Sequence, residues 1–220
     1  MIPFRKFISR HLDPQDRLGE VLFGLIMALG FTGAVRLGVE EPDNRELFFS
    51  ILGCNIAWGI VDGVMYAMTS LFERGRKARV FRGVSEAKTE AEAFARIGKE
   101  LDDRLEPLTS EEERRQIYGW IAKVAARHEW SGARIQKQDL LGATAVALAI
   151  IVATIPVVVP FLFISDGWLA ARCSNTVALS LLFLLGMWWG RTVGISPWRI
   201  GAGLTAVGMA LVGITIALGG

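Results

Sequence analysis

The chain has 220 residues, of which 52% are hydrophobic and 21% are charged, and its mean hydropathy is +0.39. This composition is too apolar for an ordinary soluble domain and indicates a membrane protein. The formal net charge is only +2, so the chain lacks the basic excess typical of nucleic-acid binding, and we expect no nucleic-acid partner.

The polar and basic start of the chain, residues 1–17, is predicted to be a cytosolic segment. It does not have the pattern of a signal peptide, because no small-residue cleavage site follows a short apolar core. Two cysteines, Cys54 and Cys173, lie in or beside apolar stretches. They have neither metal-ligand spacing nor a disulfide pattern, and we interpret both as packing residues.

Five apolar segments follow, each close to the ~20 residues that a helix needs to cross the hydrocarbon core. Backbone groups in lipid must bond internally, and the segments lack the alternation of barrel strands, so helices are predicted. The expected fold is an all-α membrane protein with five transmembrane helices and a cytosolic helical insertion between the second and third. The predicted spans are 18–38, 47–72, 140–164, 174–190 and 198–218.

The insertion, residues 73–139, separates a first membrane region at 18–72 from a second at 140–220. Apolar residues recur every three or four positions from Val84 to Leu105, which predicts one amphipathic helix. After Pro107, a capping box is predicted to open a second helix. Its residues are Thr109, Ser110, Glu112 and Glu113, and the apolar face that follows is Ile117, Trp120, Ile121 and Val124.

The flanks of the segments predict an orientation. Lys and Arg gather before the first segment, after the second, and between the fourth and fifth, whereas the other loops hold few. Because cytoplasmic loops carry the excess of positive charge, the N-terminus is expected in the cytoplasm and the C-terminus outside.

Asp62, near the middle of the second segment, is the first candidate site residue. A charged side chain at mid-membrane costs at least ~2.5–3.5 kcal/mol, so such residues usually face a bundle interior or an ion pathway. Asn55, Gly59, Tyr66 and Thr69 share its side of the helix at helical spacing. The functional interpretation is a cation or proton site. The alternative is a neutral or hydrogen-bonded carboxyl group that joins helices.

Three further residues are candidates for the same pathway. By depth along their segments, Met27 and Met65 are expected at the level of Asp62, and Glu20 nearer the cytoplasmic mouth. A carboxylate with thioethers suits a borderline divalent metal better than Na⁺ or Mg²⁺. The alternatives are core packing for the methionines and a carboxylate extended towards water for Glu20.

The insertion holds many acidic residues, whose oxygens can bind Fe²⁺ or Mn²⁺. The candidates there are Glu86, Glu90, Glu112 and Glu113. Lysines and arginines are interleaved with them, so a solvated face of ion pairs is the alternative.

Pro156 and Pro160, four residues apart in the third segment, predict a helix break that either shapes a pathway or is purely structural. The small residues of the fifth segment predict close helix packing. No nucleophile with a base and no phosphate-binding glycine loop is visible, so an enzyme is not expected.

Several stretches together resemble the vacuolar iron transporter family, most closely a bacterial branch of it. They are FGLIMALGFTGAV, LGCNIAWGIVDGVMYAMTSLFERGR, TIPVVVPFLF, RCSNTVALSLLFLLG and PWRIGAGLTAVGMALVGITIALGG. The resemblance implies a homodimer in a bacterial inner membrane that exports Fe²⁺ or Mn²⁺, commonly in exchange for protons. It places Glu20 at the first-helix pathway carboxylate, where the family usually has aspartate, and Met65 loosely at the pathway methionine.

The leading hypothesis is therefore a transporter that moves a divalent transition metal out of the cytoplasm, with the metal as substrate and no resident cofactor. The alternative is a membrane scaffold or sensor whose cytosolic helices bind a protein partner. Transport of another cation, or of protons alone, is a third possibility.

Overall fold

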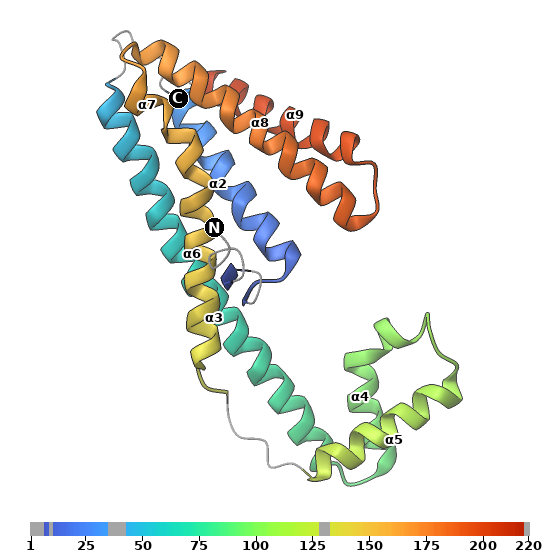
Figure 1. Ribbon diagram of the computed structural model, residues 1–220. Coiled ribbons are helices and arrows are strands. Elements are labelled where there is room, and N and C mark those ends of the chain that lie inside the picture. Colours follow the sequence, from blue (N-terminus) through green and yellow to red (C-terminus); the bar gives the residue numbers. More distant parts are fainter. Residues whose placement is uncertain (1–6, 9–10, 35–42, 128–132, 218–220) are drawn as a thin grey trace. The chain divides into compact units, whose positions relative to one another are not determined.

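The computed structural model describes residues 7–8, 11–34, 43–127 and 133–217, and within these ranges the chain is helical and contains no strand (Figure 1). The all-α fold class is thus confirmed. Eight helices follow in chain order in the described residues. They are α2 (Pro14–Ala34), α3 (Asn44–Ser85), α4 (Glu90–Leu105), α5 (Glu111–Arg127), α6 (Lys137–Val158), α7 (Pro160–Phe163), α8 (Gly167–Val193) and α9 (Pro197–Ala217).

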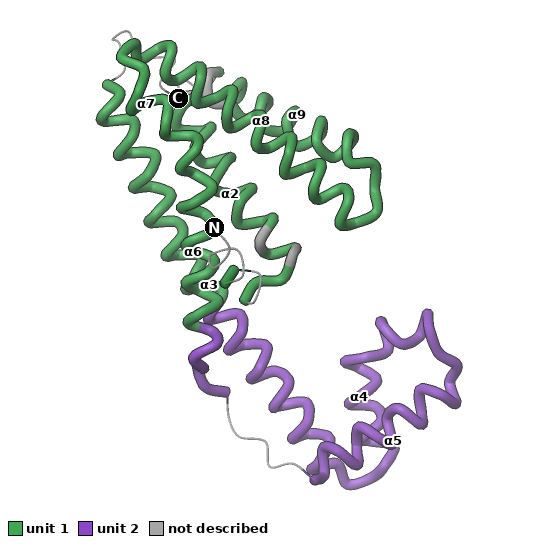
Figure 2. Tube along the Cα trace, in the orientation of Figure 1, with its two compact units in different colours: residues 1–66, 140–220 green, residues 67–139 purple. Residues whose placement is uncertain are grey.

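The chain divides into two compact units, shown in different colours in Figure 2. The first contains residues 1–66 and 140–220, and the second contains residues 67–139. Helix α3 runs without interruption from one into the other. Its 42 residues extend about 63 Å, twice the ~30 Å of a hydrocarbon core.

Four helical stretches in the described residues are long and apolar enough to cross a membrane: Asn44–Ser85, Lys137–Phe163, Gly167–Val193 and Pro197–Ile214. Helix α2 contributes a shorter apolar stretch, Leu18–Thr32. The structure therefore supports four to five membrane helices where the sequence predicted five.

The bounds of the fourth predicted segment, 174–190, are wrong by several residues at each end. The Asp166 carboxylate accepts a hydrogen bond from the Leu169 amide at 2.8 Å and so caps α8 well before residue 174. The helix ends at Gly194, whose φ of 77° favours glycine. Hydropathy missed these turns because they contain polar residues.

In the first unit, helix α2 packs against α8 and α9. The three helices meet where the side chains of Leu29 and Leu182 converge on Gly208. Leu25, Leu29, Ile51 and Leu182 are among the most deeply buried side chains of this core. A polar contact adds to the apolar ones, since the Thr32 hydroxyl hydrogen-bonds to the Asn175 side chain on α8.

The third predicted segment is divided at its prolines into two helices, although the backbone of Val159 between them remains helical. Pro156 lies within α6, Pro160 begins α7, and Val159 lies between the two helices. Proline has no amide hydrogen, so the local ladder of backbone bonds is interrupted. The buried Ser174 hydroxyl on α8 donates to the Val157 carbonyl at 2.7 Å and supplies a bond at the break.

The second unit contains its own core, in which the predicted apolar face of the insertion is buried. The prediction of one helix from Val84 to Leu105 is wrong, because α3 ends at Ser85 and α4 begins at Glu90. Thr89 caps α4 by accepting from the Glu92 amide at 3.2 Å. The buried core residues nevertheless come from both sides of this break: Val84, Ala93, Ile97, Tyr118 and Ala125.

The predicted capping box of α5 is confirmed. The Ser110 amide donates to the Glu113 carboxylate at 2.8 Å, and the Glu113 amide donates back to the Ser110 hydroxyl at 3.3 Å. Trp120 was expected on the apolar face, but it is 68% exposed and lies outside this core.

An ion pair between Arg74 and Asp139 closes the second unit on itself. Arg74 Nη1 and Nη2 donate to the two oxygens of Asp139 at 3.0 and 2.6 Å. Asp139 Oδ2 also accepts from the Gln136 amide at 2.7 Å. The Asp139 side chain is 5% exposed, so its carboxylate is bound by protein groups and not by bulk water.

Candidate functional site

Helices α2 and α3 are paired along the first unit, and two contacts show their register. The Cys54 thiol on α3 lies 3.3 Å from the Met27 sulfur on α2. Glu20, two turns before Met27, and Asp62, two turns after Cys54, lie within hydrogen-bonding distance of each other. The helices are thus antiparallel, and their register brings two carboxyl groups together.

The Glu20–Asp62 carboxyl pair is only partly satisfied by the protein. Asp62 also receives a hydrogen bond from the Trp58 side chain. One oxygen of each carboxyl group, Glu20 Oε2 and Asp62 Oδ2, is buried without a hydrogen-bond partner. Buried polar atoms are rarely left this way, and such atoms need an explanation such as a bound ion or a proton.

The chemistry of the pair follows from its two like charges. Two carboxylates in contact repel each other strongly when both are ionised, and more so where water is scarce. A shared proton or a bound cation removes this repulsion. The pair is therefore able to hold either one, and to exchange one for the other.

Asp62 is positioned by two glycines on either side of it in the chain, Gly59 and Gly63. A β-carbon at Gly59 would lie 3.2 Å from the Ala147 carbonyl oxygen, and one at Gly63 would lie 2.7 Å from the Ala143 carbonyl oxygen. The backbones of α3 and α6 therefore approach closely at this level. This role of Gly63 was not predicted from the sequence, although the spacing in GIVDG is the small-xxx-small pattern of membrane helix contacts.

Met27 does not lie at the level of Asp62, where it was expected, whereas Met65 follows Asp62 by three residues on α3. Met27 contacts Cys54, seven residues or about 10 Å along α2 from Glu20, and Met65 is 59% exposed. The expectation that they share the level of Asp62 took residue 72 as the end of the second segment. That depth estimate failed because α3 continues to Ser85.

The acidic candidates of the insertion are dispersed. Glu86 follows the end of α3, while Glu90 begins α4, so they do not share one helix face as i,i+4 neighbours. Glu112 is exposed, and Glu113 is used as the cap of α5. The hydrogen bonds from the amide and hydroxyl of Ser110 lower the pKa of Glu113. In the described part of the chain, no three His, Cys, Asp or Glu side chains gather in a set able to hold a metal ion.

A scan against protein-family models and a search of curated proteins both give no match to this chain. The function is therefore argued from the carboxyl pair and its surroundings.

Proposed function

We propose that the chain is a membrane transporter that moves a divalent transition-metal ion, Fe²⁺ or Mn²⁺, out of the cytoplasm in exchange for protons. The observation that supports this proposal is the Glu20–Asp62 pair, which joins two helices within their apolar stretches. Intramembrane carboxyl groups are costly, and where they occur they usually mark an ion path.

The charge of the pair suits a divalent ion. Two ionised carboxylates carry a charge of −2, which one divalent cation neutralises. Carboxylate oxygens are suitable ligands for Mn²⁺ and, among borderline ions, for Fe²⁺. When the ion leaves, protons restore neutrality, so metal and protons would alternate on the same oxygens. This alternation is the physical basis of the proposed exchange.

The remaining parts of the proposal come from the loop charges and from the resemblance. We place the N-terminus in the cytoplasm and the C-terminus outside, in a bacterial inner membrane, with two copies of the chain forming a homodimer. Large apolar side chains exposed on the long helices, including Val64 and Met65 on α3, are compatible with contact to lipid.

Replacing Asp62 with asparagine is expected to reduce metal flux by about tenfold or more, because the amide keeps the shape but removes a charged ligand. The measurement is uptake of Fe²⁺ and Mn²⁺ into proteoliposomes with an imposed pH gradient. Glu20→Gln is expected to behave alike. Glu46→Gln, at an exposed site in the first turn of α3, is the control and should transport normally. Normal flux through folded Asp62→Asn protein would refute the role of the pair.

Replacing Gly63 with alanine is expected to lower flux although no ligand is changed. The new methyl group would overlap the Ala143 carbonyl of α6, so α3 must shift, and Asp62, its neighbour in the chain, must shift with it. Gly53→Ala on the same helix is the matched control, since a β-carbon there meets nothing within 4 Å. Equal flux through the two variants would show that the close α3–α6 contact does not position the site.

A scaffold or sensor is the second candidate, and one observation in the second unit favours it. A cavity of about 460 Å³ in this unit combines an apolar lining with charged side chains, as a binding surface for a partner would. No flux of either metal from folded wild-type protein would favour this second candidate. The lining includes Glu73, Arg76, Lys77, Phe81, Ile97 and Arg104.

A further inference from the structure

The contact between Met27 and Cys54 brings two sulfur atoms from different helices together. The Cys54 thiol donates to the Met27 thioether at 3.3 Å, and both side chains are half-buried. Thioethers and thiolates are soft ligands, which select ions such as Cu⁺ and also bind Zn²⁺ and Cd²⁺. The thiol proton occupies the position between the sulfurs that a cation would take.

Asn55 adds an independent sign of a missing ligand. Its side chain is fully buried, and its amide group donates to the Ile51 carbonyl at 2.9 Å. The other end, Oδ1, has no hydrogen-bond partner. It lies beside Gly24 of α2, where a β-carbon would be 3.5 Å from this oxygen and 3.3 Å from the Ile150 carbonyl oxygen. Gly24 is one turn of α2 from Met27.

The spacing of the sulfurs is close to what a metal requires. At a metal–sulfur distance of ~2.3 Å and a tetrahedral angle, two sulfur ligands lie about 3.8 Å apart. The observed separation is 3.3 Å, so the sulfurs need to part by only about half an ångström. The unbranched, flexible side chain of methionine can absorb a shift of this size.

We propose that Met27, Cys54 and the Asn55 carbonyl oxygen form a second cation site, one that takes a soft or borderline transition-metal ion. Binding replaces the thiol proton, which is released to solvent, so affinity rises with pH. The site lies about 10 Å along α2 from Glu20. The role of this site as a second binding position on the transport path rests on the proposed function. Its ability to bind a metal ion can be tested without measuring transport.

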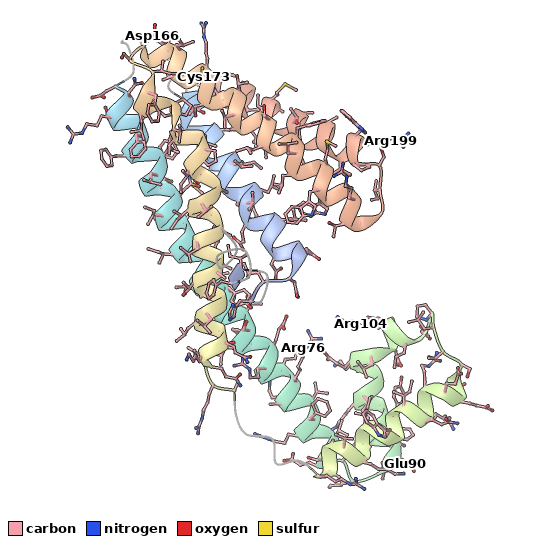
Figure 3. All side chains as sticks on the ribbon, in the orientation of Figure 1. Arg76, Glu90, Arg104, Asp166, Cys173 and Arg199 are labelled. Atoms are coloured by element: carbon pink, nitrogen blue, oxygen red, sulfur yellow. The ribbon has the colours of Figure 1, made fainter. Side chains whose placement is uncertain are left out.

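The test is titration of the purified full-length protein with Cd²⁺ in detergent. Thiolate binding is followed by its ultraviolet charge-transfer absorption. All variants carry Cys173→Ser, which removes the other thiol. Figure 3 shows Cys173 on α8, near Asp166. The expected result is one thiolate-bound Cd²⁺ per chain in this background and no thiolate absorption with Cys54→Ser. With Met27→Leu, the affinity for this Cd²⁺ is expected to fall about tenfold or more.

Two further variants make the result specific. Met65→Leu replaces an exposed methionine and should bind Cd²⁺ as the Cys173→Ser background does. Met27→Leu nearly conserves volume, so it is expected to fold even if Cys54→Ser does not. Absence of thiolate absorption in the Cys173→Ser background, or equal affinity of Met27→Leu and Met65→Leu, would overturn the site. Asp62→Asn should retain Cd²⁺ binding while losing flux, which separates failure of this inference from failure of the proposed function.

Discussion

Replacing Arg74 with alanine is expected to lower the Tm of the second unit by several degrees, because it leaves the Asp139 carboxylate without its cation. Arg74 binds both oxygens of Asp139, whose side chain is 5% exposed. Thermal unfolding in detergent, followed by helical circular dichroism, measures the change in Tm.

Arg76→Ala provides a matched control on the same helix. Arg76 also forms an ion pair, with Glu100, but its side chain is 66% exposed and that of Glu100 is 32% exposed. Exposed pairs contribute about 0–1 kcal/mol, so the Tm of this variant should change little. If Arg74→Ala and Arg76→Ala change the Tm equally, the burial of Asp139 does not increase the contribution of its ion pair to stability.

Replacing Gly186 with alanine is expected to destabilise the α8–α9 pair by about 1–3 kcal/mol. A β-carbon at Gly186 would lie 2.7 Å from the Gly201 α-carbon and 2.8 Å from the Ile200 carbonyl oxygen. These are backbone atoms of α9, so rotation of a side chain cannot relieve the overlap. The two helices must move apart. The measurement is again Tm in detergent.

Gly203→Ala is the control for this substitution. Gly203 lies on α9, and a β-carbon there meets nothing within 4 Å. Alanine favours the helix by up to ~1 kcal/mol over glycine, so this variant should be as stable as the wild type or slightly more stable. A lower Tm for Gly203→Ala than for Gly186→Ala would contradict the close packing of α8 on α9.

The helices were largely predictable from the sequence, since apolar length and capping residues are local signals. Ser110 with Glu113 is the clearest case, because the two residues cap α5 as their spacing indicates. The break between Ser85 and Glu90 was missed because the apolar periodicity continues across it. Such periodicity predicts which residues face a core. It does not predict whether those residues lie on one continuous helix or on two.

The candidate site was predictable only in part. Asp62 was identified from the cost of a carboxyl group in an apolar segment, and Glu20 from its depth in the first segment and from the family resemblance. Their contact depends on the register of α2 against α3, which no local pattern encodes. The closeness of Met27 and Cys54 was missed for the same reason, because each residue alone has the pattern of a packing residue.

The packing of α2 has a consequence for how the chain is made. Leu29 of α2 meets Leu182 of α8 and Gly208 of α9, so its partners are synthesised more than 150 residues later. At ~5–20 residues per second, the ribosome needs roughly 8–30 s to supply them. Helix α3 emerges much sooner, so the Glu20–Asp62 pair can form while the α8-facing side of α2 still lacks its protein partners. During this interval lipid or the insertion machinery must cover that face of α2.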